Sequence, residues 1–240
     1  MEHLLDIHCH FVPGVDDGAS TAEDGVAMLR VLRRLGFERV IATPHMHTSL
    51  FDNDKQGLLA AFELMKPALA QPELPAVDLS CEHHFDDVVF QRLLGGEGLP
   101  YPGGRAVLVE FPYHAFPTRV RDRFFDLRLR NLRPVLAHPE RYHPAQNDMS
   151  VLEPLIDGGT ALLLDVGALA GKYGRPARRT AERLLDEGWY AAACSDAHRP
   201  SDMDAVQQGI ERLVEIVGAE QALYLLSDGP RAILDGTLQT

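Results

Sequence analysis

The stretch Leu4-Leu5-Asp6-Ile7-His8-Cys9-His10 predicts a buried strand that carries a metal site at its end. Side chains alternate between the two faces of a strand, so His8 and His10 point to the same side and can bind one metal ion. Near the other end of the chain, Cys194-Ser195-Asp196-Ala197-His198 repeats this spacing with a carboxylate and an imidazole. Together, the two segments predict a metal centre assembled from distant parts of the sequence.

Apolar, β-rich runs alternate with segments of helical periodicity along the whole chain. Strands are expected at residues 4–10, 39–43, 76–81, 106–111, 133–137, 161–166 and 190–194, and helices at 21–35, 55–70, 86–94, 117–131, 148–158, 174–187 and 202–217. Residues 221–227 are at least as helical as extended, so we count seven strands. Strands that alternate with helices predict an α/β fold with a parallel sheet.

Four further polar residues each close one of these apolar runs, namely His45, Glu82, Glu110 and His138. A (β/α) barrel gathers the ends of all its strands at one face, whereas an open doubly wound sheet concentrates its chemistry at one switch point. Polar residues at so many strand ends therefore favour the barrel over the open sheet. The Gly-rich segment 95–104 is too short to divide the chain, so we expect residues 1–240 to form a single domain.

The composition is that of a globular protein, and the charge limits its partners. The chain has 240 residues, 45% of them hydrophobic, and a formal net charge of -12, which argues against a nucleic-acid binder with a broad basic surface. No apolar run approaches the roughly 20 residues of a membrane span, and the first residues lack the features of a signal peptide. We therefore expect a cytoplasmic protein with no nucleic-acid partner and no membrane insertion; the oligomeric state stays open.

The cysteines fit neither a disulfide framework nor a thiol-based mechanism. They are odd in number and form no CxxC pair. A cysteine-based tyrosine phosphatase needs an arginine six residues after its nucleophile, but the residues six beyond Cys9, Cys81 and Cys194 are Val15, Asp87 and Pro200. Cys9 alternates away from His8 and His10, which predicts that it packs against the barrel wall.

The segment Pro13-Gly14-Val15-Asp16-Asp17-Gly18 follows the first strand. A Pro-Gly turn followed by two acids can swing a carboxylate back over the strand end, although Asp-Gly is also a common turn pair. We expect both functions here, with Asp16 as a metal ligand and Asp17 as its structural partner.

These motifs resemble the polymerase-and-histidinol-phosphatase (PHP) superfamily, and more closely its bacterial protein-tyrosine phosphatases of the capsule and exopolysaccharide type. The resemblance runs from about residue 4 to residue 200, and its most specific parts are the HxHxxPGxDDGA segment at 8–19 and HPERY at 138–142. It implies a distorted seven-stranded (β/α) barrel that holds three divalent metal ions, with Mn²⁺ expected first and Fe or Zn as alternatives. It also implies removal of phosphate from tyrosines of a bacterial tyrosine kinase that controls polysaccharide export.

The resemblance assigns a role to each candidate site residue by position. It implies a first metal held by His8, His10, Glu82 and Asp196, a second held by Glu82, Glu110 and His138, and a third held by Asp16, His45 and His198. Arg141 matches the phosphate-binding arginine of the family. A second arginine is not at its usual spacing, and Arg199 is its candidate substitute.

The residue types support this chemistry independently. Nitrogen and oxygen ligands without thiolate suit Mn, Fe or Zn. Two adjacent ions can lower the pKa of water toward roughly 7, so that a metal-activated hydroxide attacks the phosphate. The planar fork of Arg141 can donate two hydrogen bonds to phosphate, although a surface salt bridge with Glu140 is its alternative role. The rings of Phe111, Tyr113, Phe116 and Tyr142 are expected either to wall a phenyl pocket or to complete the top of the barrel.

Three other functions remain open alternatives. The same site could act on a small phosphoester such as histidinol phosphate, or on the 3′ end of a nucleic acid, which the acidic charge disfavours. An amidohydrolase commonly bridges its metals with a modified lysine at a strand end, but none of Lys55, Lys66 and Lys172 lies at one. A non-enzymatic protein, in which metals only hold the barrel together or regulate a kinase partner, would bind metal without turnover.

Overall fold

The computed structural model describes Met1 and residues 3–238, and it shows a mixed α/β fold with parallel sheets. One sheet has three strands in the order β1 (Leu4–Cys9), β2 (Phe37–Ala42) and β4 (Ala76–Leu79). The other has six, in the order β3 (His45–Met46), β5 (Glu82–His84), β6 (Ala106–Glu110), β7 (Arg133–Ala137), β8 (Ala161–Asp165) and β9 (Tyr190–Cys194). Each predicted strand region contains a strand, and all strand pairs are parallel, as predicted.

Two predicted strands end earlier than expected, and each is followed by a separate short strand. The region predicted at 39–43 is followed by the separate short strand β3, and the region predicted at 76–81 is followed by β5. Pro44 lies at the first break, where it cannot donate a ladder hydrogen bond. These breaks place β3 and β5 in the six-stranded sheet, where β3 pairs with β5 and β5 pairs with β6.

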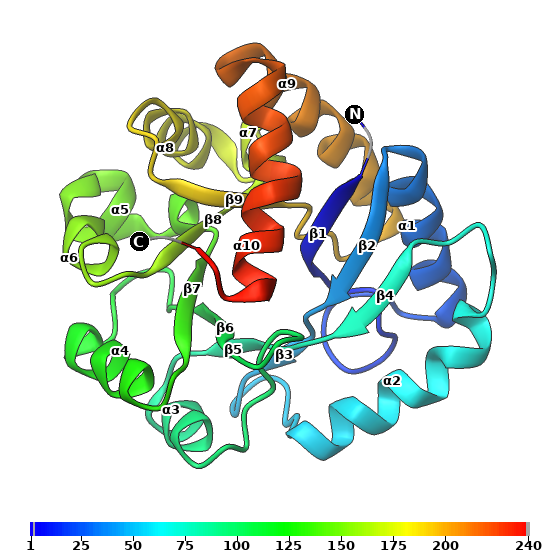
Figure 1. Cartoon of the computed structure of the whole chain (residues 1–240), viewed down its shortest axis with the longest axis horizontal. Helices are drawn as coiled ribbons and strands as arrows, with labels where there is room; N and C mark the ends of the chain where they lie inside the picture. Colours follow the sequence, from blue (N-terminus) through cyan, green and yellow to red (C-terminus); the bar gives the residue numbers. More distant parts are fainter. Residues whose placement is uncertain (2, 239–240) are drawn as a thin grey trace.

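Six helices lie where helical periodicity was predicted, and together with shorter segments they cover the outside of the strands (Figure 1). They are α1 (Ala22–Arg34), α2 (Lys55–Leu69), α3 (Asp87–Leu94), α4 (Val120–Leu129), α8 (Gly174–Asp186) and α9 (Met203–Leu223). The short helices are α5 (His143–Asn147), α6 (Glu153–Ile156), α7 (Val166–Leu169) and α10 (Gly229–Asp235). No helix in the described part of the chain is both long and apolar enough to cross a membrane.

The helix predicted at 148–158 is instead a 3₁₀ turn at Met149–Leu152 followed by α6. Pro154 sits in the first turn of α6, where its missing N–H is tolerated, and it starts a new helix rather than continuing the preceding turn. The ambiguous segment 221–227 is helical: it joins the end of α9 to a π-helical turn at Tyr224–Asp228.

The first helix shows how local sequence sets an element boundary. The Thr21 side chain accepts a hydrogen bond from the Asp24 N–H, and the Asp24 carboxylate accepts one from the Thr21 N–H, both at 3.2 Å. This capping box satisfies two N–H groups that the helix itself leaves unpaired. The chain leaves the helix at Gly36, whose φ of +103° favours glycine.

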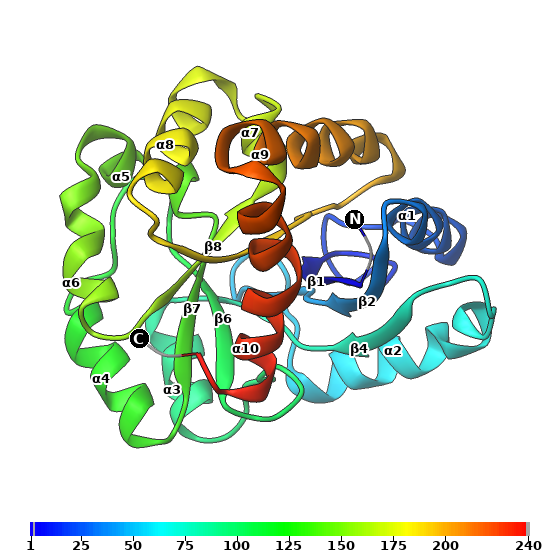
Figure 2. The ribbon, with the colours of Figure 1, turned by 45° about the horizontal axis from the view of Figure 1, so that its top comes forward.

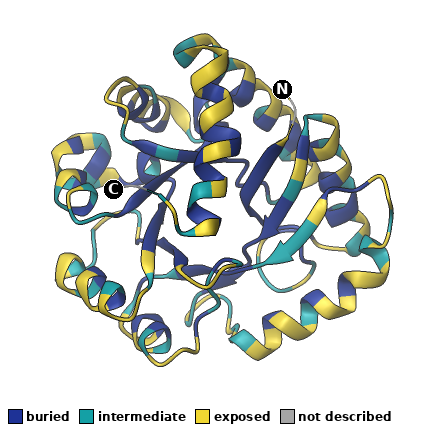
Figure 3. Ribbon diagram, viewed as in Figure 1, coloured by how far each residue is buried: buried dark blue, intermediate teal, exposed yellow. Residues whose placement is uncertain are grey.

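Buried strands and half-exposed helices divide the apolar residues into layers (Figure 3). An inner cluster contains side chains from both sheets, including Leu5 and Ile41 from one sheet and Leu108 and Leu163 from the other. A larger outer cluster packs the strands against the surrounding helices. Figure 2 shows this arrangement from a second side, with β6, β7 and β8 running inside α4, α5 and α6.

Candidate metal centre

Eight of the predicted ligands converge at strand ends, six of them near a strand's carboxyl end and two at the start of the short strands β3 and β5. β1 carries His8 and leads into His10, β3 begins with His45, β5 begins with Glu82, β6 ends with Glu110, and His138, Asp196 and His198 follow β7 and β9. Seven of these eight residues are at least nine-tenths buried. The eighth, His198, has 19% of its side chain exposed. The structure therefore brings together eight of the nine residues predicted as metal ligands.

Glu82 lies at the centre of this group, with imidazoles facing both of its carboxylate oxygens. Its Oε1 is 2.9 Å from His138 Nε2 and 3.5 Å from His8 Nε2. Its Oε2 is 3.0 Å from His45 Nδ1 and 3.5 Å from His10 Nε2. A carboxylate shared between several imidazoles in this way has the geometry of a bridge between adjacent ions.

Asp196 closes the other side of the cluster. Its Oδ1 lies 3.0 Å from His8 Nε2, 3.5 Å from His10 Nε2 and 3.6 Å from His198 Nδ1. Burial would raise the pKa of Asp196, but the neighbouring His8 and His198 outweigh it and hold that pKa well below its usual value. The carboxylate is therefore ionised at neutral pH.

Donor atoms in the cluster form four overlapping groups in which all atoms lie within 4.8 Å of one another. They are His8, His10 and Glu82; His8, His138 and Asp196; His45, Glu82 and Glu110; and His10, His45 and His198. Several inward atoms, among them His8 Nε2, His10 Nε2, His45 Nδ1 and Asp196 Oδ1, are buried without a hydrogen-bond partner among the described residues. Buried polar atoms are normally satisfied, so this donor set fits divalent cations.

The backbone is strained at two of the candidate ligands. His138 has a φ of +35° and Asp196 a φ of +42°, both in the left-handed region that residues with a Cβ seldom occupy. Such a conformation costs on the order of 1–3 kcal/mol per residue and clusters at functional sites. Here it turns each side chain from the strand end back into the cluster.

Asp16 does not join the group predicted for it. Its Oδ2 accepts hydrogen bonds from His10 Nδ1 at 2.8 Å and from the His45 N–H at 3.0 Å, while Oδ1 accepts one from the Gly18 N–H. Burial would raise the pKa of Asp16, but the charge of His10 lowers it to about 2. Asp16 thus orients the His10 ring instead of facing His45 and His198.

The neighbouring Asp17 occupies the expected position instead. Its Oδ1 is 3.5 Å from His45 Nε2 and 3.5 Å from His198 Nε2, and the residue is half-exposed. The turn that ends directly after the two acids is tight: a Cβ on Gly18 would lie 2.3 Å from the His10 carbonyl oxygen. The sequence contained both acids, but the direction of each side chain depends on this turn.

Arg141 points at the cluster, as its assignment requires, and not at Glu140. Its Nη1 donates to Asp196 Oδ2 at 2.6 Å, and its Nη2 donates to the Tyr113 hydroxyl. The guanidinium carbon lies 4.2 Å from the centre of the Tyr173 ring and 5.0 Å from that of Tyr113. Two aromatic rings and a carboxylate therefore hold the arginine in place beside the candidate metal ligands.

Two residues around Arg141 were missed by the sequence analysis. Tyr173 stacks on the guanidinium, and Asp165 Oδ2 lies 4.0 Å from Arg141 Nη1 without a hydrogen-bond partner of its own among the described residues. Burial and the nearby Asp196 raise the pKa of Asp165 to about 7. Asp165 is a polar residue at the end of an apolar strand, the same pattern that marked the predicted ligands, so the sequence could have identified it. No sequence pattern marks Tyr173.

Glu140 has a structural position instead. It is fully buried, its Oε2 accepts a hydrogen bond from the Tyr190 hydroxyl at 2.8 Å, and its Oε1 accepts one from the Asp165 N–H at 3.0 Å. Burial raises the pKa of Glu140 to about 8. The residue therefore anchors the loop after β7 to the neighbouring strands.

Arg199 is exposed and lies at the rim of a cavity of about 260 Å³ that also contacts Arg141 and His198. Lys172 lines the same cavity, and its Nζ is 3.2 Å from Asp202 Oδ2. The chain thus offers two further cations at this edge of the cluster, and the sequence analysis named only Arg199 as a site residue.

The three cysteines lie in the core, away from solvent. Cys9, Cys81 and Cys194 are fully buried, and burial raises the pKa of each thiol well above its ordinary value. Cys9 belongs to the outer apolar cluster, as its alternation predicted.

Of the rings proposed as pocket walls, Phe111 and Tyr142 are buried in the core, Phe116 lines a separate cavity, and Tyr113 alone among them contacts Arg141.

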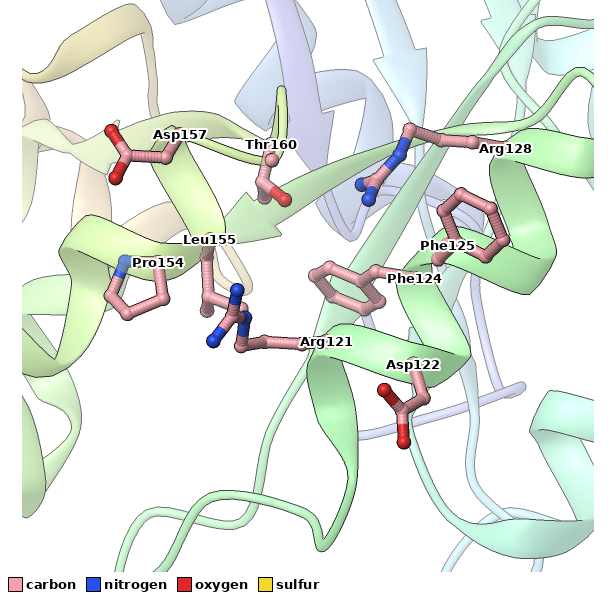
Figure 4. A pocket seen from close by; sticks show the side chains of 10 residues that line it. Arg121, Asp122, Phe124, Phe125, Arg128, Pro154, Leu155, Asp157 and Thr160 are labelled. Atoms are coloured by element: carbon pink, nitrogen blue, oxygen red, sulfur yellow. The ribbon is translucent and has the colours of Figure 1, made fainter.

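A cavity of about 370 Å³ between α4 and α6 lies outside this centre (Figure 4). Arg121, Phe124 and Arg128 line it from α4, and Thr160 lines it from the amino end of β8. No predicted site residue contributes to it. The opposite end of β8 is the one that carries Asp165 beside Arg141, so this cavity is separate from the site.

Known proteins resemble the chain over nearly its full length. Tyrosine-protein phosphatase YwqE of Bacillus subtilis strain 168 is 29% identical over 232 residues, which cover 96% of this chain and 91% of the relative. Tyrosine-protein phosphatase CpsB of Streptococcus pneumoniae is 24% identical over 238 residues, covering 96% and 98%.

The structural comparisons agree. A crystal structure from a study of YwqE from Bacillus subtilis and CpsB from Streptococcus pneumoniae, described there as unique metal-dependent tyrosine phosphatases, superposes with a TM-score of 0.89 at 28% identity, covering 99% of this chain and 96% of that one. The lactonase Lmo2620 of Listeria monocytogenes has a TM-score of 0.63 at 11% identity, covering 99% and 95%, which shows a shared fold alone. The family model for capsular polysaccharide synthesis, CpsB/CapC, matches residues 4–235, so the chain belongs to this family.

Proposed function

We propose that the protein is a metal-dependent protein-tyrosine phosphatase that acts on a bacterial tyrosine kinase controlling capsular or exopolysaccharide synthesis. The observation that carries this proposal is the position of Glu82, whose two carboxylate oxygens face four buried imidazoles. Divalent ions held there would neutralise phosphate charge and lower the pKa of a bound water. Membership of the CpsB/CapC family supports phosphotyrosine as the substrate, and the expected cytoplasmic location stays a prediction.

The residues of the chain would have two roles, ion binding and phosphate binding. The carboxylates and imidazoles of the cluster would hold three divalent ions, with Mn²⁺ expected first, because their nitrogen and oxygen donors suit such ions. Arg141 would bind the phosphate, since its planar fork matches phosphate oxygens and its stacking on Tyr173 fixes its direction. Arg199 and Lys172 are candidates for a second phosphate-binding cation.

The proposed ligand set is the predicted one with a single exchange. His8, His10, Glu82 and Asp196 would bind the first ion, Glu82, Glu110 and His138 the second, and His45, His198 and Asp17 the third. Asp16 would support His10 from behind, because a carboxylate bonded to the far ring nitrogen of a ligating histidine fixes its orientation.

We expect Asp17→Asn and Asp16→Asn to differ in metal content. Asp17→Asn should bind one ion fewer than the wild type at saturating Mn²⁺, because it removes a direct ligand. Asp16→Asn should bind as many ions as the wild type but more weakly, by about 10–100-fold, the usual cost of losing such a supporting partner. Elemental analysis after Mn²⁺ titration measures both values, and the reverse pattern would restore Asp16 as the ligand.

We further propose that the two sheets form one distorted seven-stranded (β/α) barrel, with β3 continuing β2 and β5 continuing β4. Hydrogen bonds across the breaks support this, from the Thr43 N–H to Cys9 O at 2.9 Å and from the Ser80 N–H to Ala42 O at 2.8 Å. A parallel bridge between Cys9 and Ala197 links β1 to the segment after β9. The inner cluster shared by both sheets also supports residues 1–240 as a single domain.

Metal removal and replacement test the proposed activity. Chelation should abolish hydrolysis of a phosphotyrosyl peptide, and Mn²⁺ should restore it, because the charge that stabilises the phosphate comes from the bound ions. Alkylation of the metal-loaded protein with iodoacetamide should change turnover little, since all three thiols are fully buried with raised pKa values. Unchanged turnover after complete metal removal, or full inactivation by alkylation, would contradict the metal-dependent mechanism.

The alternative function keeps the site and changes the substrate to a small phosphoester such as histidinol phosphate, or to single-stranded DNA for a nuclease. A substrate panel with the same Mn²⁺-loaded protein separates these cases. Turnover of histidinol phosphate above that of the phosphotyrosyl peptide would favour the alternative.

A further inference from the structure

Two cavities meet at Arg141 and share Tyr173 as their common wall. The aromatic cavity, of about 360 Å³, is lined by Tyr113, His114, His143, Tyr173 and Pro176 together with Arg141. The charged cavity, of about 260 Å³, is lined by Asp17, Lys172, His198, Arg199 and Asp202 together with the same Arg141 and Tyr173. A phosphate ester held at Arg141 can extend its leaving group into either one.

The two linings differ in what they can accept. The aromatic cavity has aromatic, imidazole, proline and alanine walls beside Arg141, one neutral amide from Gln146, and no carboxylate among the described residues that line it. The charged cavity carries the carboxylates of Asp17 and Asp202, and Asp202 is already paired with Lys172. A phenyl ring gains from leaving water for an apolar wall and from contact with other rings, so it favours the aromatic cavity.

The aromatic cavity is also fixed in shape by contacts between its loops. The His143 N–H donates to the Tyr113 carbonyl oxygen at 2.8 Å, which ties the loop after β6 to the segment after β7. The rings of His114 and His143 pack edge to face with centres 4.6 Å apart. A wall that is already ordered costs little to organise when a ligand binds.

We propose that the aromatic cavity is the subsite for the tyrosyl ring of the substrate, while Arg141 and the metal cluster hold its phosphate. This inference rests on the proposed phosphatase function and adds the direction in which the leaving group lies. It makes His114 and His143, at the outer wall, the residues that meet the peptide next to the phosphotyrosine. The charged cavity stays free of the ring, which leaves its Asp17 and His198 to the third ion and its cations to the phosphate.

Filling the aromatic cavity tests this directly. We expect His114→Trp, on the Mn²⁺-loaded protein, to raise KM for a phosphotyrosyl peptide by about tenfold or more, the scale on which a pocket rejects a misfitting apolar group. The inhibition constant of inorganic phosphate should stay within about twofold of the wild type, because phosphate lacks the ring. His114→Ala is the matched comparison: it removes the imidazole without filling the space, so KM should rise by less than in His114→Trp.

The neighbouring cavity supplies the opposing variant. Ser201 is exposed and lines the charged cavity, so Ser201→Trp fills that space instead. Because that cavity also holds Asp17, His198 and Arg199, which the proposed function uses for the third ion and the phosphate, we expect this variant to raise KM for the peptide and the inhibition constant of inorganic phosphate together. A KM unchanged in His114→Trp, or a phosphate inhibition constant that rises in it as much as KM does, overturns the assignment, whereas a wild-type protein that fails to hydrolyse phosphotyrosyl peptide overturns the proposed function itself.

Discussion

Glu82→Gln should lose bound metal and lower kcat for a phosphotyrosyl peptide by well over a hundredfold, the upper end of what loss of a mere supporting partner costs. Glu82 is buried with 1% exposure, and each of its oxygens faces two imidazoles. An amide keeps the shape of the side chain but offers one neutral oxygen in place of two that share a negative charge. The two ions that would share the Glu82 carboxylate therefore both lose a charged ligand in this variant.

Glu140→Gln is the matched control for this change. Glu140 is also a buried glutamate at the carboxyl ends of the strands, but its partners are Tyr190 and the Asp165 N–H. Because its pKa is raised to about 8 by burial, it is protonated at neutral pH, so glutamine is close to its native state. We expect metal content and kcat near those of the wild type; equal losses in both variants would mean that Glu82 acts only through the fold.

The strand ends of the site could be predicted from sequence because parallel βα units leave few choices. Seven apolar runs alternate with helical segments, which predicts parallel strands, and the carboxyl ends of such strands meet at one face of a barrel. The positions of His8, His45, Glu82 and Glu110 in the sequence therefore already assign them to one site. The alternation of side chains along the first strand also predicted that Cys9 lies on the opposite side from His8 and His10. These predictions depend on period and topology, which the sequence encodes directly.

The features of the site that the sequence does not specify depend on local backbone geometry. Asp16 and Asp17 are adjacent, and their roles differ only because the turn that ends at Gly18 directs one carboxylate toward His10 and the other toward His198. The stacking of Tyr173 on Arg141 joins a helix start to a loop after another strand, and no periodicity marks it. Contacts of this kind become visible only when the loops are placed.

Arg141→Ala should lower kcat by about 10²–10³, the usual loss when one positioned donor to a developing oxyanion is removed, while the ions stay bound. The side chain is held by Asp196, Tyr113 and Tyr173, so it presents its remaining donor capacity to the phosphate without reorganisation. Arg141→Lys should recover little activity, because an ammonium group lacks the planar fork and cannot stack between the two rings in the same way.

The control must separate phosphate binding from support of Asp196, to which Arg141 also donates. Tyr113→Phe removes one acceptor for the guanidinium and leaves the Asp196 contact, so it should reduce kcat by only a few-fold, the scale of one hydrogen bond of about 1 kcal/mol. Elemental analysis should show wild-type metal content in all three variants. If Arg141→Ala instead loses an ion in proportion to its activity, the arginine acts by holding Asp196, and phosphate binding must be assigned to Lys172 or Arg199.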